Sequence, residues 1–186
     1  MLENAAVKRK AEFLAGRLMA RCALENLYGK SCQILTGRHR APIWPEEVVG
    51  SISHTDNSAC CAVALKTDVP YLGIDKEDWI PSLIIKDISD NIINEREKLL
   101  LRRLSLDFEK AFTLTFSAKE CLFKALYPSI GYYFDFDSAE IVSLSLEDNS
   151  FELILTKTLA ADYPRGRKFI GYFVVDSEGS LCWLSG

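Results

Sequence analysis

The segment LGIDKED at residues 72–78 carries the most information about the fold and the site. Residues 71–75 have the apolar pattern of a buried strand, and two carboxylates stand at its end. Because residues i and i+2 of an extended strand point to the same side, Asp75 and Glu77 can converge on one cation. Mg²⁺ prefers oxygen ligands of this kind. Two acids at a strand end are more often simply solvated, so a third ligand is needed to predict a metal site.

Before this strand, the sequence predicts a helix and two further strands. The spacing of apolar residues predicts a helix over 5–28, and Gly29 is a suitable C-terminal stop. A loop rich in glycine and proline then leads to a strand over 48–53. A polar turn separates it from a strand over 59–66.

After the strand, helices come first and further strands follow. Residues 81–106 predict one or two helices, the better one over 95–104, and residues 107–127 predict a helix that Pro128 ends. The remaining strands are predicted at 139–146, 151–156, 168–175 and 181–184. This order predicts an α+β protein in two similar halves, each with a helix on a small, mostly antiparallel sheet.

The segment FSAKECLFKA at 116–125 offers the third acid. Glu120 and Lys124 are four residues apart and share one face of the predicted helix, where such a pair is usually a modest surface interaction. The phenylalanines of this helix lie on its other side. A carboxylate between Lys119 and Lys124 suits a metal-bound phosphate, with Glu120 binding the metal and the lysines neutralising the phosphate.

Two polar segments earlier in the chain suit phosphate binding. Ser53 and His54 end a predicted strand, and no partner at triad-like spacing indicates a nucleophilic serine, so they are better suited to donating hydrogen bonds to phosphate. Arg38 and Arg40 belong to a run that reads GRHRAP at 37–42, and guanidinium groups bind phosphate in a bidentate way. A lone histidine at the end of a strand, such as His54, is more often a turn residue than a ligand.

The basic residues are concentrated near the N-terminus. Residues 1–40 carry a net charge of +5, and residues 41–186 carry −9, although the whole chain has only −4. The basic segment could meet an anion and the acidic one could hold a cation, although charged segments of this kind are more often solvated surfaces. Nucleic acid is a competing partner, but the basic excess is small and no nucleic-acid-binding motif is present, so we expect none.

Composition and length exclude several classes of protein. The 186 residues fit one domain or two closely packed halves. With 48% hydrophobic and 26% charged residues, the chain is neither disordered nor collagen-like. The longest apolar run, 59–65, is too short to span a bilayer, and the N-terminus has no apolar signal-peptide core. We therefore expect a cytoplasmic protein with no membrane contact.

The six cysteines and two histidines do not predict a transition-metal site. No C-x-x-C pair and no Cys/His cluster of zinc spacing occurs. We expect reduced, mostly buried cysteines.

Taken together, these segments resemble a known family. The motifs RAPIWPEEVVGSISHT at 40–55, LGIDKED at 72–78 and FSAKECLFKA at 116–125 are similar to the three signature motifs of the 4′-phosphopantetheinyl transferase superfamily. With KRKAEFLAGRLMAR at 8–21, they resemble the siderophore-synthetase branch of its surfactin-type group, the branch of the enterobactin synthases. The resemblance covers about residues 6–127.

The resemblance implies a fold and a reaction. It implies two pseudo-symmetric α+β halves, which we place at 1–75 and 76–186, with coenzyme A bound between them. It implies Mg²⁺-dependent transfer of the phosphopantetheine arm from coenzyme A to a serine of an apo carrier protein, with release of 3′,5′-ADP. The stretch at 8–21 lies closer to the N-terminus than is usual in this branch, so part of the first sheet is expected to be missing. A monomer is expected.

The resemblance also implies roles for single residues. Asp75, Glu77 and Glu120 match the magnesium ligands. Glu120 is the first candidate for the general base, directly or through water, and Glu77 the second. Lys124 would stabilise the departing phosphate. The residues implied to contact coenzyme A are Ser53, His54, Lys119, Lys124, Lys8, Arg9, Arg17, Arg38 and Arg40, and which of the basic ones meets the 3′-phosphate stays open.

One departure from the family pattern and two alternative functions remain. Cys121 stands where this family commonly has serine, which predicts a change in packing without loss of activity. The same chemistry could act on the acyl carrier protein of fatty-acid synthesis. A non-catalytic module that binds coenzyme A or a carrier protein would keep the basic residues, but it would not need all three carboxylates.

Overall fold

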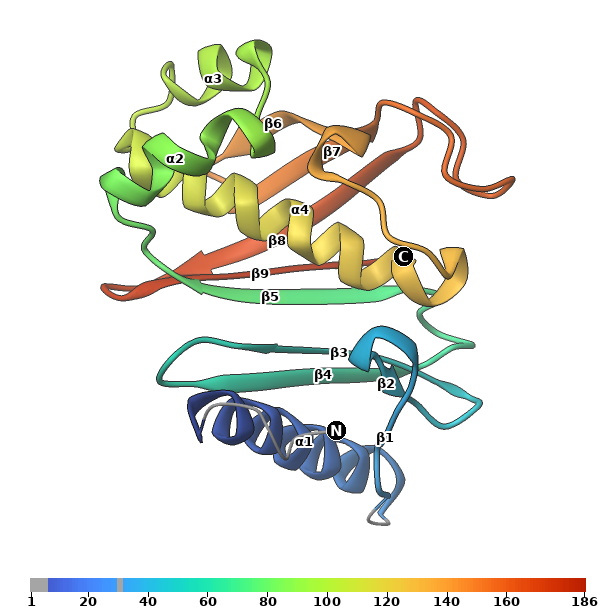
Figure 1. Cartoon of the computed structure of the whole chain (residues 1–186). Coiled ribbons are helices and arrows are strands. Elements are labelled where there is room, and N and C mark those ends of the chain that lie inside the picture. The colour runs from blue at the N-terminus through green and yellow to red at the C-terminus, as the bar shows by residue number, and fades with distance from the viewer. Residues whose placement is uncertain (1–6, 30–31) are drawn as a thin grey trace.

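A long helix on a two-stranded antiparallel sheet forms the first part of the chain (Figure 1). The computed structural model describes residues 7–29 and 32–186. Helix α1 (Val7–Tyr28) ends at Gly29, which has a φ of +66°, as the sequence predicts; residues 5 and 6 of the predicted helix lie outside the described residues. Strands β3 (Val48–His54) and β4 (Ala59–Leu65) confirm the predicted hairpin. The helix packs on them through a row of small and apolar residues, Gly16, Ala20 and Leu24.

Between α1 and β3, a short ribbon stands where the sequence predicts only a loop. Strands β1 (Leu35–Thr36) and β2 (Pro42–Ile43) pair around a single turn, η1 (Arg38–Arg40). His39 and Arg40 both have positive φ, at 53° and 65°. Non-glycine residues adopt this conformation rarely, and it costs energy unless the surroundings impose it. Two-residue strands are too short to show a periodic pattern, which is why the sequence does not predict them.

The second part of the chain is built on a five-stranded antiparallel sheet. Its order is β5-β9-β8-β7-β6, so β9, the last strand of the chain, lies between β5 and β8. The strands are β5 (Leu72–Asp78), β6 (Ala139–Ser145), β7 (Ser150–Leu155), β8 (Lys168–Val175) and β9 (Gly179–Ser185). All of these strands confirm the predicted ones. The whole of β5 belongs to this sheet, so the proposed division of the chain would lie before Leu72 and not at residue 75.

Three helices accompany the five-stranded sheet, and the longest lies across it (Figure 1). They are α2 (Ser82–Ile92), α3 (Glu95–Leu101) and α4 (Phe108–Ile130), and a short turn, η2 (Phe136–Ser138), leads into β6. Residues 81–106 therefore form two helices, the second of which ends earlier than residue 104.

The prediction that Pro128 ends α4 is wrong. The helix continues to Ile130 and stops at Gly131, which has a φ of +77° and whose N–H donates to the carbonyl of Tyr127 at 2.8 Å. Proline removes one backbone hydrogen bond of a helix. Only two helical residues follow Pro128, and a glycine in the left-handed conformation ends the helix.

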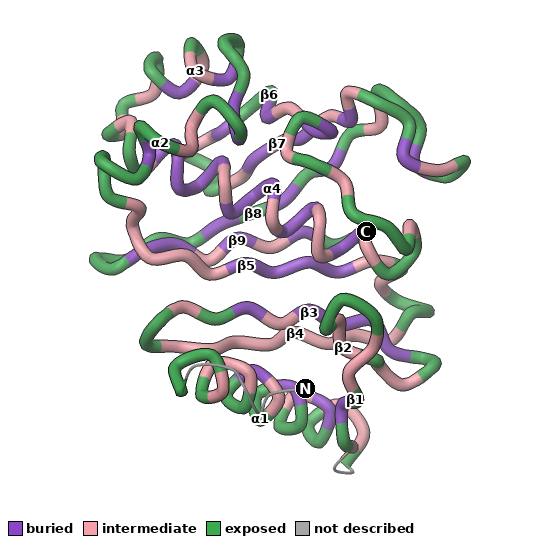
Figure 2. Tube along the Cα trace, in the orientation of Figure 1, coloured by how far each residue is buried: buried purple, intermediate pink, exposed green. Residues whose placement is uncertain are grey.

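Each part has its own hydrophobic core, and the second is the larger. Ala20, Leu24, Ile34 and Val48 form the first core. The second fills the space between α4 and the five-stranded sheet, and its largest fully buried side chains are Phe112, Phe151, Phe169 and Phe173. Figure 2 shows the buried residues running along α4 and the inner strands. The predicted α+β class and the arrangement of a helix on an antiparallel sheet in each half are confirmed, although the halves differ in size.

The cysteines only partly follow expectation. All six carry free thiols, but only Cys121 and Cys182 are buried, and Cys22 is exposed. Cys121 lies on α4, where its thiol donates to the carbonyl of Cys182 at 3.0 Å. Among the described residues, no helix has both the length and the apolar character required to cross a membrane.

Strands β3 and β5 join the two parts through serine side chains. The hydroxyl of Ser51 accepts a hydrogen bond from the N–H of Ile74 at 3.0 Å, and that of Ser53 accepts one from the N–H of Lys76 at 3.0 Å. Side chains here take the place of a backbone ladder. On the α4 side of β5, Gly73 lets the helix approach closely, since a Cβ at this position would lie 2.0 Å from the carbonyl oxygen of Cys121.

We expect Gly73→Ala to destabilise the protein, because the added methyl group meets helix backbone that cannot move aside. Overpacking of this kind costs about 1–3 kcal/mol. Urea unfolding followed by circular dichroism measures the loss. The matched control is Gly37→Ala, where the added Cβ lies 3.1 Å from the flexible side chain of Ile43, and its stability should stay near that of the parent. Equal losses in the two variants would contradict the close approach of α4.

Candidate active site

Three buried or half-buried side chains from three elements meet where the two parts join. The ammonium of Lys124 on α4 lies 2.5 Å from Oδ1 of Asp75 on β5. The hydroxyl of Ser53, on β3, donates to the same oxygen at 3.0 Å and accepts from Lys124 at 3.0 Å. The side chain of Asp75 is 2% exposed and that of Lys124 is 25% exposed. The contact is therefore a closed ring of charge-assisted hydrogen bonds with one side open to solvent.

The charges of this ring stabilise one another. Burial acts to lower the pKa of Lys124, but the charge of Asp75 and their hydrogen bond outweigh it and raise that pKa. Lys124 is therefore a permanent cation. The second oxygen of Asp75, Oδ2, is buried and has no hydrogen-bond partner. One acceptor of the ring thus remains available for a further positive group.

Two more carboxyl groups lie close to this ring. Burial, followed by the charge of Asp75, raises the pKa of Glu77 to about 8 despite the opposing charge of Lys124. Burial and the charge of Asp75 likewise raise the pKa of Glu120, again against Lys124. Three acids therefore share one lysine, and the site has too little positive charge to keep all of them ionised at neutral pH.

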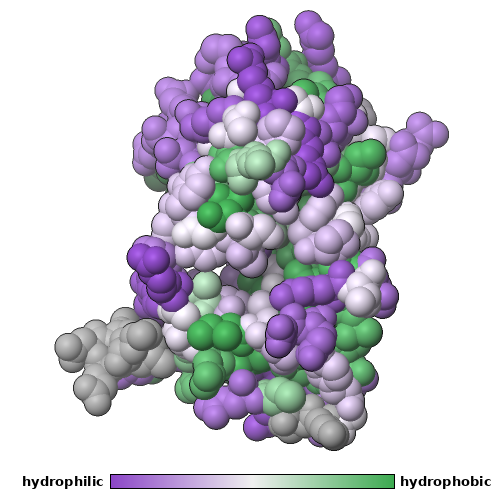
Figure 3. All heavy atoms as spheres, turned by 90° about the vertical axis from the view of Figure 1, so that its right-hand side faces the viewer, coloured by the Kyte–Doolittle hydropathy of each residue, from purple (hydrophilic) through white to green (hydrophobic). Residues whose placement is uncertain are grey.

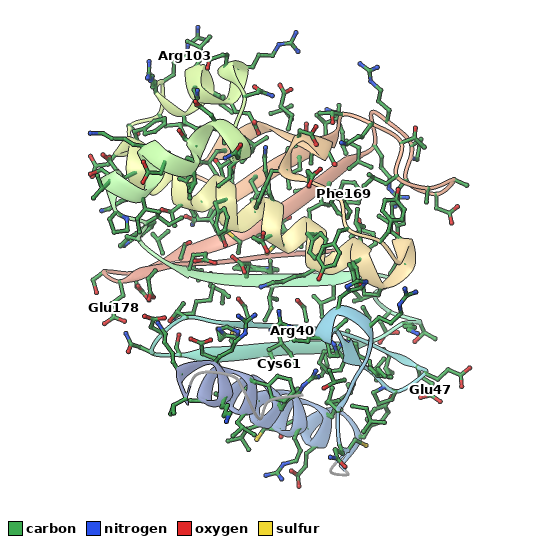
Figure 4. The ribbon with its side chains drawn as sticks, viewed as in Figure 1. Arg40, Glu47, Cys61, Arg103, Phe169 and Glu178 are labelled. Carbon is green, nitrogen blue, oxygen red and sulfur yellow. The ribbon has the colours of Figure 1, made fainter. Side chains whose placement is uncertain are left out.

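The ring lies at the floor of a cleft of about 880 Å³ between α1, the η1 turn, the end of β3 and α4. Figure 3 shows the surface hollowed between the upper and lower parts of the molecule, and Figure 4 shows Arg40 at their junction. The residues that line the cleft are Arg9, Glu12, Phe13, Thr36, His39, Arg40, His54, Glu120 and Lys124. A cleft with several cations along its walls suits an elongated anion.

Two smaller spaces adjoin the cleft. One of about 250 Å³ lies beneath the η1 turn, where His39 meets the ring of Tyr133 edge-on with centroids 4.9 Å apart and Trp44 forms part of the wall. The other, of about 290 Å³, lies along α4 beside Glu120 and is lined by aromatic residues that include Phe123 and Phe134. Both suit flat or apolar groups attached to an anion.

The structure brings most of the predicted site residues together. Arg9, Arg40 and His54 line the cleft, and Glu120 and Lys124 form its floor. Ser53 and Asp75 lie beneath them, and Glu77 lies near Asp75.

Two of the predicted arginines lie outside the cleft. Arg17 lines a neighbouring groove of about 690 Å³, where it lies 5.0 Å from the ring of Phe13 and donates to Thr36 at 3.4 Å. Arg38 is exposed on the η1 turn and is not among the residues that line the cleft. Lys8 pairs with Asp56 on the surface at 2.5 Å.

The assignment of Lys119 to coenzyme A phosphate is corrected by the structure. Its side chain is 3% exposed, and its ammonium lies 2.8 Å from Glu97. It also donates to the carbonyls of Ile92 and Phe136 at 2.7 and 3.2 Å. An ammonium has three donors, so none remains for a ligand. Adjacent residues of a helix point about 100° apart, which is why Lys119 does not share the face of Glu120.

The sequence does not predict two residues that shape this region, His39 in the cleft and Glu97 beside Lys119. His39 reaches the cleft because its backbone has positive φ, which no sequence pattern indicates. Glu97 is buried as the partner of Lys119. A signal for Glu97 does exist, because Asn94 and Glu97 have the spacing of a helix capping box, and the structure contains that box.

The carboxylates fit a hard divalent cation in their chemistry. All three are oxygen donors, and Oδ2 of Asp75 lacks any partner. Within residues 7–29 and 32–186, however, no three His, Cys, Asp or Glu side chains are already placed to hold a metal ion. Binding an ion would therefore need the glutamates to turn toward Asp75.

Comparisons with known proteins show the family to which the chain is similar. Residues 1–64 match the family model described as the 4′-phosphopantetheinyl transferase N-terminal domain, and residues 71–168 match that of the 4′-phosphopantetheinyl transferase superfamily. Enterobactin synthase component D of Escherichia coli K12 is 43% identical over 124 residues, which cover 67% of this chain and 58% of that protein. Its Salmonella typhi counterpart is 35% identical over 82% of this chain and 63% of its own length.

A relative from another genus is similar to the same extent. The 4′-phosphopantetheinyl transferase Svp of Streptomyces mobaraensis is 40% identical over 74% of this chain and 56% of that protein. The chain thus spans less than two thirds of the length of these relatives. A holo-(acyl-carrier-protein) synthase from Bacillus anthracis, solved with CoA (3′,5′-ADP), superposes with a TM-score of 0.41 at 17% identity over 63% of this chain and 95% of that one. A TM-score this low supports no structural inference.

The raised pKa of Glu77 predicts how stability varies with pH in the absence of metal. The unfolded chain releases this proton near pH 4.5, but the folded protein keeps it until about pH 8. The favourable contribution of the protonated form is therefore complete below pH 4.5 and is lost as the pH rises toward 8. Glu77→Gln lacks this loss, so its stability relative to the parent should increase between about pH 5 and pH 9.

Urea unfolding in the presence of a chelator at three pH values measures the difference. The control is Glu147→Gln, which removes an exposed carboxylate from the turn between β6 and β7, at the edge of the sheet opposite β5. It should follow the parent at every pH. A constant difference between Glu77→Gln and the parent would contradict the raised pKa.

Proposed function

The chain belongs to the 4′-phosphopantetheinyl transferase superfamily, and from this premise we propose that it transfers the phosphopantetheine arm of coenzyme A to a serine of an apo carrier protein. The observation that carries the proposal is the ring of Ser53, Asp75 and Lys124 with two further acids beside it, at the floor of a cationic cleft. This arrangement suits a reaction in which an anion is bound, a hydroxyl is deprotonated and a phosphate departs.

Glu120 is the proposed base. The serine oxygen of the carrier would attack the β-phosphorus of coenzyme A and form a new P–O bond, while its proton passes to a carboxylate. Glu120 lines the cleft and Glu77 does not, so Glu120 is better placed to receive it. Burial raises the pKa of Glu120, and a base with a pKa nearer to neutral accepts a proton more readily.

Lys124 is proposed to stabilise the leaving group. When the bond between the β-phosphorus and the bridging oxygen breaks, the electron pair stays on that oxygen, which leaves as part of 3′,5′-ADP. Lys124 is a permanent cation at the floor of the cleft, and its exposed side faces the space where this charge would develop. Arg9, Arg40 and His54 are proposed to hold the remaining phosphates of coenzyme A.

Asp75, Glu77 and Glu120 are proposed to hold Mg²⁺. A bound divalent ion would neutralise charge on the pyrophosphate and draw the carboxylates into their ionised forms. The unpartnered oxygen of Asp75 supports this assignment, because a buried anionic oxygen without a donor is costly.

The names of the relatives support a choice of client. Because several are enterobactin synthase components, we propose a carrier domain of siderophore or other nonribosomal peptide synthesis. The acyl carrier protein of fatty-acid synthesis is the alternative client. A purely binding module is disfavoured, because binding an anion gains nothing from three carboxylates around one lysine.

We further propose that the protein works as a monomer in the cytoplasm, without nucleic-acid or membrane partners. Free thiols at all six cysteines are in keeping with a reducing compartment. Excess acid over the chain as a whole disfavours binding to nucleic acid.

The test of the proposal is incubation with coenzyme A, Mg²⁺ and an apo carrier, followed by intact-mass measurement of the carrier. We expect the carrier to gain one phosphopantetheine group. Peptidyl, aryl and acyl carriers run side by side identify the client. Glu120→Gln should reduce the rate by at least about 10²-fold, because it removes the proton acceptor while preserving shape. Glu12→Gln, which changes another acid of the cleft, is the matched control and should stay active.

Comparing coenzyme A with dephospho-coenzyme A tests whether Arg9, which lines the cleft, meets the 3′-phosphate. If it contacts the 3′-phosphate, Arg9→Met should weaken coenzyme A about tenfold, as expected for a lost charge-assisted hydrogen bond, and leave dephospho-coenzyme A nearly unchanged. Isothermal titration calorimetry measures both affinities. Arg21→Met alters an arginine of the same helix that faces the neighbouring groove, and it should change neither. Equal weakening of both ligands by Arg9→Met would place Arg9 elsewhere.

A further inference from the structure

A second buried ion pair lies one helical position before Glu120. Lys119 and Glu97 are 2.8 Å apart, and their side chains are 3% and 1% exposed. Lys119 also donates to the carbonyl of Ile92 at the end of α2 and to that of Phe136 in η2. One ammonium therefore joins α4 to the last residue of α2 and to the first residue of η2.

Both oxygens of the Glu97 carboxylate also accept hydrogen bonds from backbone N–H groups. Oε2 accepts from the N–H of Asn94 at 2.8 Å, which is half of the capping box of α3. Oε1 accepts from the N–H of Ile141 on β6 at 2.8 Å. The pair thus connects α2, α3, α4, η2 and β6, and every donor and acceptor of the two charged groups is satisfied.

Such a pair is a poor way to gain stability. Burial lowers the pKa of Lys119, and the charge of Glu97 opposes this only partly, so pairing does not fully offset the desolvation of the ammonium. Apolar side chains of similar size often stabilise a core equally well. What the pair provides and apolar groups do not is a directed link to the carbonyl of Phe136.

That link forms one wall of the space beside Glu120. The pocket of about 290 Å³ is lined by Glu120, Phe123 and the segment 133–136. Phe134 packs on Phe123 with centroids 5.1 Å apart, and Phe136 packs on Phe116 at 5.5 Å. Contacts between rings still allow the segment 133–136 to shift along α4. The hydrogen bond from Lys119 to the carbonyl of Phe136 fixes its position along the helix axis.

We propose that Glu97 and Lys119 are positioning residues that hold the segment 133–136 against α4, and so set the shape of the pocket in which Glu120 works. The role in catalysis rests on the proposed function. The role in holding the segment does not. The effect acts through shape, because among the described residues the side chains of Lys119 and Glu97 hydrogen-bond to each other and to backbone groups, and not to Glu120.

The test is the double variant Glu97→Gln/Lys119→Met, which removes both charges and leaves neither buried alone. Hydrogen–deuterium exchange should become at least about tenfold faster in residues 133–137, since the restraint on this segment is lost. The turnover number for carrier modification should fall about tenfold or more, because small displacements in an active site are costly. The affinity for 3′,5′-ADP, measured by calorimetry, should stay within about twofold, and the pH profile of turnover should not move.

A matched control changes another ion pair in the same way. Glu152→Gln/Lys168→Met removes a pair that joins β7 and β8 at 2.9 Å, far along the sheet from β5. It should alter neither exchange at 133–137 nor turnover. If the test variant does not fold, Glu97→Asp replaces it, because aspartate keeps the charge but shortens its reach by one methylene. The same changes, in smaller size, are expected.

The possible results separate this inference from the proposed function. Unchanged exchange at 133–137 overturns the inference, whatever the kinetics. A tenfold weaker affinity for 3′,5′-ADP also overturns it, since Lys119 would then contact phosphate. Turnover equal to that of the control removes the catalytic role. Faster exchange in a protein whose parent form modifies no carrier supports the structural link and overturns the proposed function alone.

Discussion

The ion pair between Asp75 and Lys124 is the contact on which the rest of the structure depends. It joins β5 to α4, and through Ser53 it extends to β3 in the other half of the molecule. Removing one partner would leave a buried charge uncompensated, which typically costs about 3–5 kcal/mol. The contact that holds the halves together is therefore also the floor of the cleft, so a ligand in the cleft would touch both halves at once.

Two lysines of one helix illustrate how burial divides structural from chemical roles. Lys119 has every donor satisfied by Glu97 and by backbone carbonyls. Lys124, five residues later, pairs with one oxygen of Asp75 and keeps one side open to the cleft. Around it, burial raises the pKa values of Glu77 and Glu120. The charges of the first cluster are satisfied within it, whereas the second has three acids for one lysine, which supports the proposal that it binds a cation.

Most of the secondary structure follows from the sequence, because alternation, helical periodicity and glycine stops are local signals. The strands of the large sheet, the hairpin of β3 and β4 and the end of α1 at Gly29 are all predicted. The predicted end of α4 at Pro128 is wrong, because a proline in the last turn of a helix disrupts fewer of the residues that follow than one in its middle. The ribbon around η1 is missed because two-residue strands and the positive φ of His39 and Arg40 leave no periodic trace.

The sequence by itself predicted those groups of site residues that are close together on one strand or one helix. Asp75 and Glu77 are two apart on a strand, and Glu120 and Lys124 are four apart on a helix, and this spacing predicts the acids and the cation of the proposed site. Only the tertiary structure decided which charges pair, because partners such as Glu97 and Lys119 are 22 residues apart and come from different elements. It also decided which arginines reach the cleft, since a long side chain takes its direction from the packing around it.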